Sequence, residues 1–540
     1  MHQCLQIREI LASICSKVSC QTILTTTSHT TLLSLAATCC TFKETALDEL
    51  WRIQTSLIPL VKCFPADSWE YRNNGRTVVC PSLKLCYRFW LSCVQGFTRP
   101  LSPSDWKAIT PFATRINFLL LRTRTQNTSS GPNEFLPPEI WDMLAVSRPR
   151  SLEPLLPNLR ELHWNQWRSS FRHLGQLLTP TLRRLEIHTP LEEIDDIGNS
   201  VLLSLQDICP SLWILHMVWS QSSKAEGQSL KVETLRVKAF QQWSSLPLRW
   251  LKITGYVDEC ILGHIGNIST LKVFQFGHDQ TKNISVFPRQ KFPALELLGV
   301  TGCNIDSLAQ LLQSVASPSV RRVQALSCFC NSTTAYKGLF AALSQFPALE
   351  LLNLVEISER AHPFSATPAG PRIIRSEDLA PLSKSSKLNF INIATTGIFE
   401  LNDVLLAGIE WPDMQMLRLC SLPSGDSRWH RPSCANTLEG GLVPLLTRCP
   451  KLEYLEFYID ATIHDFSLEA CPGNGVQNTT IKSLVVGASP ISNTVKVAAF
   501  LFGILPNLSS IRATTHVNAW GRVVQHFGTF RAVVGWSKST

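Results

Sequence analysis

A nine-residue phrase occurs twice in this chain, as FPALELLGV (292–300) and as FPALELLNL (346–354). In both copies an apolar residue is followed by two more, three and five positions later. The last two apolar side chains are two residues apart, so in an extended segment they point to the same face. A single short strand cannot bury that face alone, and the repetition therefore predicts strands stacked side by side around a shared core.

The same phrase recurs at irregular intervals along the chain, with a mean step of about 27 residues between copies. INFLLL from Ile116 is a candidate additional copy. The copies begin at Leu159, Leu182, Leu212, Val232, Leu248, Leu271, Leu295, Val320, Leu349, Leu388, Met414, Leu452, Ile481 and Leu508. An apolar pattern alone arises by chance in a chain that is 44% hydrophobic, so a second regular feature is needed to support the repeat.

Proline supplies that second feature. It lies two residues before the first apolar position in many copies, at Pro157, Pro180, Pro210, Pro293, Pro318, Pro347, Pro412, Pro450 and Pro506. At this position it ends a helix and favours extended backbone. Apolar residues have helical spacing in several of the preceding segments, namely 306–316, 337–345, 440–449 and 493–505. Each unit is therefore predicted to run from helix through proline to strand.

This pattern resembles leucine-rich-repeat proteins of the irregular, longer-period kind, over residues 111–515. The asparagine that often closes the family consensus is mostly absent, so the subfamily stays open. The resemblance implies an α/β fold, a solenoid with a curved parallel sheet and outer helices. Residues 516–540 are expected to form a C-terminal cap or tail.

The first fifty residues have helical rather than strand periodicity. One apolar series contains Leu5, Ile7, Ile10, Leu11 and Ile14, and a second covers residues 32–51, with Thr30 or Thr31 as its expected N-cap. So many apolar positions cannot all be hidden within so short a segment. They need a partner protein or the adjoining solenoid.

These two segments resemble an F-box, covering residues 1–55, with a helical connector expected at 56–110. The matching residues are Glu9, Ile10, Leu11, Leu32, Leu35, Ala36, Cys39, Phe42, Leu50 and Trp51. Arg8 stands where the family usually has proline, and Cys40 where it often has arginine. F-box proteins with leucine-rich repeats are numerous in fungi. The alternative is that these helices simply cap the N-terminal end of the solenoid.

The resemblance implies the substrate-recognition subunit of a cullin-RING (SCF-type) ubiquitin ligase, which binds a Skp-type adaptor through its N-terminal helices and a protein substrate on the concave face of the repeats. The predicted adaptor-binding residues are Leu5, Ile7, Ile10, Leu11, Ile14, Leu32, Leu35, Cys39, Phe42, Leu50 and Trp51. A non-ligase leucine-rich-repeat scaffold for protein interactions and a nucleic-acid-binding repeat protein remain as alternatives.

Residues flanking the fourth position of each phrase are predicted to line the concave face. The expected substrate-binding residues are His163, Arg184, His188, His216, Arg236, Lys238, Trp250, Lys252, Leu297, Leu351, Phe390, Arg418, Tyr454 and Tyr458. Basic residues and histidines dominate the early repeats and apolar residues the middle ones, which suits a protein substrate with an acidic patch beside an apolar one. A strand shifted by one residue would exchange the two faces.

The sequence offers little evidence of catalysis or metal binding. It contains no HExxH, GxSxG, Walker A or GxGxxG motif, so no enzyme activity and no cofactor are expected. The three histidines at 163, 188 and 216 could converge on adjacent strands. Without a matching set of cysteines or carboxylates, we expect them to be solvated polar side chains rather than metal ligands.

Charge and cysteine usage bear on partners and compartment. The net charge of +9 is spread without a basic block, which disfavours a nucleic-acid partner. No run has the length of a membrane span, and Arg8 and Glu9 interrupt any signal-peptide core, so no membrane association is expected. The 18 cysteines contain no CxxC pair and are expected to be reduced, which favours a cytoplasmic or nuclear protein, although N-x-S/T triplets argue weakly the other way.

Overall fold

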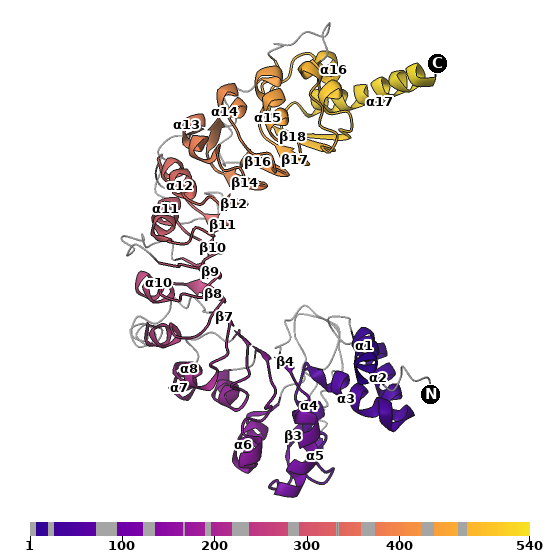
Figure 1. Ribbon diagram of the computed structural model, residues 1–540, viewed down its shortest axis with the longest axis vertical. Helices are drawn as coiled ribbons and strands as arrows, with labels where there is room; N and C mark the ends of the chain where they lie inside the picture. Colours follow the sequence, from indigo (N-terminus) through magenta and orange to yellow (C-terminus); the bar gives the residue numbers. More distant parts are fainter. Residues whose placement is uncertain are drawn as a thin grey trace, which may run out of the picture. The chain divides into compact units, whose positions relative to one another are not determined.

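A computed structural model describes most of the chain (Figure 1). The described residues are 7–19, 26–71, 94–121, 136–165, 168–188, 196–218, 237–278, 291–330, 332, 334–357, 373–422, 437–462 and 472–539. They belong to two compact units, Met1–Gly255 and Tyr256–Thr540.

Unit 1 begins with three helices, α1 (Arg8–Ser19), α2 (Thr26–Thr38) and α3 (Cys40–Arg52). On α1, Leu11 and Cys15 are buried, as are Ala46 and Leu50 on α3, so the helices share a small core. The predicted N-cap is wrong, because α2 already begins at Thr26 and both Thr30 and Thr31 lie inside it.

The sheet of unit 1 consists of parallel strands in sequence order. They are β1 (Ile53–Gln54), β4 (Phe118–Leu121), β5 (Glu161–Trp164), β6 (Arg184–Ile187), β7 (Ile214–Val218) and β8 (Trp250–Tyr256). From β4 onward each strand begins two residues after the first apolar residue of a phrase, as the repeat predicts. The copy that begins at Val232 falls on residues outside the described part of the chain; β7 pairs directly with β8, and residues 237–243 are helical.

The other described elements of unit 1 connect these strands. The region expected to be a helical connector contains helices but also an antiparallel pair, β2 with β3. The connecting elements are α4 (Ile58–Val61), β2 (Trp69–Tyr71), β3 (Val94–Phe97), α5 (Pro103–Ala113), α6 (Pro138–Ser147), the 3-10 helices Arg150–Leu152 and Arg168–Gln176, α7 (Asp196–Leu203) and α8 (Leu205–Ile208).

A buried carboxylate fixes the start of α5. Ser102 is the N-cap and forms a capping box with Asp105, whose Oδ2 also accepts from the Ser102 amide at 2.7 Å. Arg99 donates two hydrogen bonds to the same carboxylate, from Nη1 to Oδ2 at 2.7 Å and from Nη2 to Oδ1 at 3.1 Å. The Arg99 hydrogen bonds, followed by that of the Ser102 amide, hold the pKa of Asp105 well below its usual range.

We therefore expect Asp105→Asn to lower the thermal unfolding temperature at neutral pH. The folded-state pKa is depressed, so the carboxylate contributes its full stability above the unfolded pKa of roughly 3.9 and loses it as pH falls below that value. The difference in unfolding temperature between wild type and variant should shrink as the pH is lowered from 7 to 3. Asp67→Asn is the matched control, because Asp67 bonds the same Arg99 at 2.9 Å but is exposed. A difference in unfolding temperature between wild type and Asp105→Asn that stays constant with pH would contradict the stabilising role of the Asp105 carboxylate.

Unit 2 has the same architecture, with a parallel sheet and helices along one side of it (Figure 1). Its strands are β9 (Val273–Gly277), β10 (Leu297–Thr301), β11 (Arg322–Cys328), β12 (Leu351–Glu356), β14 (Phe390–Thr395), β16 (Met416–Ser421), β17 (Tyr454–Glu456), β18 (Ser483–Gly487) and β19 (Ser510–Ala513). A second, two-stranded parallel sheet joins β13 (Ile373–Arg375) to β15 (Ile398–Glu400).

The helices of unit 2 include those in the segments predicted to be helical, 306–316, 337–345, 440–449 and 493–505, and α16 in the last of these is capped by Asn493. They are α10 (Glu259–Ile265), α11 (Ile305–Ser314), α12 (Ala335–Leu343), α13 (Ser376–Leu379), the 3-10 helix Ala380–Leu382, α14 (Asp403–Ala407), the π-helix Leu438–Leu442, α15 (Val443–Arg448), the 3-10 helix Pro472–Gly475, α16 (Thr494–Ile504) and α17 (Val517–Ser539). In the described part of the chain, no helix combines the length and apolarity that crossing a membrane requires.

The repeated proline has a clear structural role. In most copies the first apolar residue donates its amide to the carbonyl three residues earlier, as Leu212 does to Cys209 (3.1 Å) and Leu452 does to Cys449 (3.2 Å). Proline then occupies the second position of a β-turn, where its fixed φ is favoured. The turn redirects the chain from helix to strand. The predicted leucine-rich-repeat architecture of helix, proline turn and parallel strand is thereby confirmed.

Candidate protein-binding surfaces

Several large apolar side chains are exposed on and next to α1 and α2. Ile7, Ile10 and Ile14 are 46%, 37% and 39% exposed, and Leu33 on α2 is 51% exposed. The three isoleucines are spaced three and four residues apart, so they share one side of the helix. Other exposed large apolar side chains of the described residues are scattered over α6, β8, β11, α14, α16 and α17.

The predicted adaptor-binding residues differ in how far they are buried within the chain. Leu35, Cys39 and Phe42 are half-buried, while Leu5 lies outside the described residues. Leu11, Leu32, Leu50 and Trp51 are buried within the chain, so they are removed from the docking surface. The ring centroids of Trp51 and of Phe112 on α5 are 4.8 Å apart, so Trp51 joins α3 to α5.

The face of the sheet that points away from the core forms the second surface, here called the open face. On most strands the fourth and sixth positions of the phrase are buried and the fifth is half-buried, whereas Glu186 on β6 and Gly299 on β10 are buried at the fifth position. In unit 1 two rows of side chains follow the register across the strands. The first row is Phe118, Glu161, Arg184, Ile214 and Trp250, and the second is Leu120, His163, Glu186, His216 and Lys252.

The predicted substrate-binding residues of unit 1 lie mainly on this open face. His188 directly follows β6 and is half-buried, and Trp250 is 43% exposed. The predicted placement of Lys238 on a strand is wrong, because this residue belongs to the helix at 237–243. Arg236 lies outside the described residues.

The open face of unit 2 has apolar side chains in its first row, with exposed Arg322 of β11 between Leu297 and Leu351. Half-buried Leu297, Leu351 and Phe390 are in register with one another through β11. Further along, Arg418 donates to Glu456 at 2.8 Å, and Tyr454 donates to the same carboxylate at 2.9 Å. Burial, with a further contribution from Glu456, raises the pKa of Tyr454 to about 12, so its hydroxyl stays protonated. Half-buried Tyr458 lies against Gly487, where a Cβ would approach its ring within 2.5 Å.

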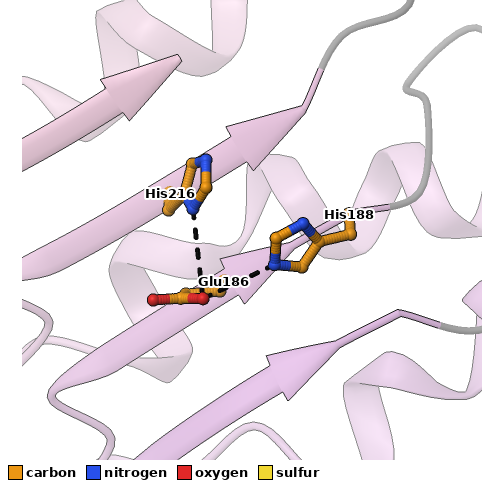
Figure 2. A group of neighbouring side chains, drawn as sticks. All are labelled: Glu186, His188 and His216. Carbon is orange, nitrogen blue, oxygen red and sulfur yellow. Dashed lines mark ion pairs between the residues drawn. The ribbon is translucent and has the colours of Figure 1, made fainter. Parts of the chain in front are cut away.

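The three histidines of unit 1 converge on Glu186 (Figure 2 shows two of them). Glu186 Oε2 lies 2.8 Å from His163 Nδ1, 3.5 Å from His188 Nε2 and 4.0 Å from His216 Nδ1. Arg184 donates from Nε to the other carboxylate oxygen, Oε1, at 2.9 Å. Burial alone would raise the pKa of the Glu186 carboxyl, but the imidazoles and the guanidinium hold that pKa well below its usual range. The carboxylate is therefore ionised.

Sequence reasoning missed Glu186 as the centre of this group. The signal was available, because the strand register places position 186 between positions 163 and 216. The expectation that no matching carboxylate accompanies the three histidines is wrong, because Glu186 lies among them.

No family model matches the chain, and no curated protein matches it. Among solved structures, an internalin from Listeria monocytogenes has a TM-score of 0.35 and 13% identity, covering 84% of this chain and 96% of its own. The yeast Rad7 and Elc1 complex has a TM-score of 0.32 and 14% identity, covering 66% of this chain and 78% of the matched chain.

Proposed function

We propose that this chain is the substrate-recognition subunit of a cullin-RING (SCF-type) ubiquitin ligase, acting in the cytoplasm or nucleus. The observation that carries the proposal is the exposed apolar row of Ile7, which directly precedes α1, with Ile10 and Ile14 on α1, together with Leu33 on α2. Exposed apolar side chains at this spacing are the anchors of a helix that docks into a groove of another protein. The F-box resemblance of the same segment names a Skp-type adaptor as that protein.

The open faces of the two sheets suit the second role, which is to hold a protein substrate. Half-buried apolar and aromatic side chains such as Leu351, Phe390 and Tyr454 supply anchors, and arginines lie among them. Interfaces between proteins are enriched in this combination. No step of this role requires the chain itself to perform chemistry, since ubiquitin transfer belongs to the recruited ligase.

The test is a double substitution, Ile10→Asp with Ile14→Asp, in the full chain. We expect affinity for a purified Skp-type adaptor, measured by calorimetry, to fall at least about 30-fold, which corresponds to the loss of one interface hot spot of about 2 kcal/mol. Leu11 is avoided because it is 2% exposed and its substitution would unfold the helices.

Val146→Asp is the matched control. Val146 is 86% exposed on α6, so it tests the effect of one new surface charge on a helix far along the sequence. Its adaptor affinity should equal that of the wild type. Equal affinity of the double variant and the wild type would refute the docking surface, and a wild-type chain that binds no adaptor would make this protein a repeat scaffold.

A further inference from the structure

We propose that Glu186, His188 and His216 bind a divalent transition-metal ion, with Zn²⁺ as the best match. This inference is independent of the proposed ligase role, because it concerns the open face of unit 1 and not the N-terminal helices. The three side chains come from β6, the residue that follows it, and β7 (Figure 2). One ligand atom from each residue lies within 4.8 Å of the other two.

The spacing of these atoms is close to that of a zinc site. The carboxylate oxygen of Glu186 is 3.5 Å from His188 Nε2 and 4.0 Å from His216 Nδ1. Around a tetrahedral ion with bonds of about 2.0–2.1 Å, ligand atoms are roughly 3.3 Å apart. Small rotations of the two imidazoles would bring the atoms to this separation. His188 is the more exposed of the two, so it has room to move.

The ligand set is also chemically suited to zinc. Two imidazole nitrogens and one carboxylate oxygen form a three-ligand set that leaves the fourth tetrahedral position for water or for an atom of another molecule. The same set also suits other first-row divalent ions, of which Co²⁺ is useful as a spectroscopic probe.

Surrounding side chains hold the ligands in the required orientation. His216 Nε2 is hydrogen-bonded to Thr254 Oγ1 at 3.2 Å, which leaves Nδ1 facing Glu186. His163 Nδ1 lies 2.8 Å from the oxygen of Glu186 that faces the histidines, and Arg184 holds the other oxygen. Such outer hydrogen bonds orient metal ligands in proteins. His163 Nε2 is buried and has no hydrogen-bond partner in the described structure, so this imidazole is placed by its contact with Glu186.

The local charge favours a cation over an anion. Glu186 is only 8% exposed, and a second carboxylate, Glu161, lies 3.8 Å from Arg184. Two carboxylates therefore face one guanidinium, and Lys252 is one strand further along the row. A phosphate or carboxylate ligand placed among the histidines would be repelled by the adjacent Glu186 carboxylate, whereas a divalent ion is attracted by it.

The experiment titrates ZnCl₂ into chelator-treated, full-length protein by calorimetry at neutral pH. We expect one ion per chain at this site, and a loss of more than about 100-fold in affinity for His188→Ala and for His216→Ala, because each removes a ligand. His163→Ala should lose about 10- to 100-fold, the effect of removing an outer hydrogen bond. Co²⁺ in place of Zn²⁺ should give the visible absorption of a tetrahedral nitrogen- and oxygen-bound ion, without the intense near-ultraviolet band of cobalt–thiolate bonds.

His264→Ala is the matched control, since His264 is a half-buried histidine on α10 and should leave the affinity unchanged. Circular dichroism of the metal-free variants establishes that each is folded. Unchanged zinc affinity in both His188→Ala and His216→Ala would overturn the proposal. A cobalt–thiolate band that accounts for all of the bound metal would also overturn it. So would the absence of zinc binding to the wild type at millimolar concentration.

Discussion

Replacing Trp520 with alanine is expected to destabilise unit 2 by about 3–5 kcal/mol, the usual cost of truncating a buried tryptophan. Trp520 is 1% exposed near the start of α17, and its indole Nε1 donates to the Ser489 carbonyl at 3.1 Å. Val523 and Phe527 follow on the same side of the helix and are equally buried. α17 packs on α16 and on β19, the last strand of the sheet, so loss of this anchor loosens the element that covers the end of the core.

The measurement is chemical denaturation followed by circular dichroism, combined with light scattering. A loosened α17 exposes the last strand and its apolar neighbours, so we expect the alanine variant to associate at concentrations where the wild type is monodisperse. Trp520→Phe should cost much less, because it keeps most of the buried ring and loses mainly one hydrogen bond of about 1 kcal/mol. Val533→Ala, at a 50% exposed position of the same helix, should stay within about 0.5 kcal/mol of wild type. Equal stability of the two alanine variants would show that α17 is not a cap.

The repeated strands could be predicted from the sequence because two independent signals coincide. Alternating apolar residues fix which side of each strand is buried, and the proline turn fixes where the strand begins. β1 has only two residues and no phrase, so it carries neither signal. The copies at Leu248, Leu271, Leu388 and Ile481 lack a proline two residues earlier but still precede β8, β9, β14 and β18, so the apolar alternation alone was sufficient there.

For the N-terminal helices, the sequence predicts the helices but not which of their residues are buried. Their apolar residues cover more than one side, and periodicity alone could not decide which side packs inside the chain. The structure places Leu11 and Cys15 inside and Ile10 and Ile14 outside. That choice depends on the shape of the neighbouring helix α3, which is a tertiary property.

The Glu186 group shows what knowledge of the register adds. Residues 163, 186 and 216 are far apart in sequence but occupy equivalent positions on β5, β6 and β7. These three side chains are neighbours because the strands are aligned in this register. The distances that decide between a hydrogen-bonded group and a metal site depend on side-chain rotation, which the sequence does not specify.

A second buried carboxylate, Glu356, holds together three elements of unit 2. It lies at the end of β12, is 3% exposed, and accepts from the Tyr336 hydroxyl of α12. Its other oxygen accepts from the Thr396 amide at 2.5 Å and from the Thr396 hydroxyl at 2.7 Å, just beyond β14. Tyr336 is also hydrogen-bonded to Thr395 at 2.7 Å. Burial raises the pKa of the Tyr336 phenol, so it stays protonated and remains a donor.

We expect Glu356→Ala to lower the free energy of unfolding of unit 2 by about 3 kcal/mol or more, because it leaves several buried donors without their acceptor. Tyr336→Phe, which removes a single donor, should cost about 1–3 kcal/mol. Glu350→Ala is the matched control, since Glu350 forms a partly exposed ion pair with Arg321 at 3.5 Å and should cost at most about 1 kcal/mol.

The double variant distinguishes a network from independent contacts. Once Glu356 is gone, the Tyr336 hydroxyl has lost its main acceptor, so removing it as well should cost little more. The double variant should therefore be more stable than the sum of the single effects predicts, by about 1 kcal/mol or more in denaturant unfolding. Strict additivity would mean that the tyrosine and the carboxylate contribute separately, and that the link between α12 and the ends of β12 and β14 rests on the apolar core alone.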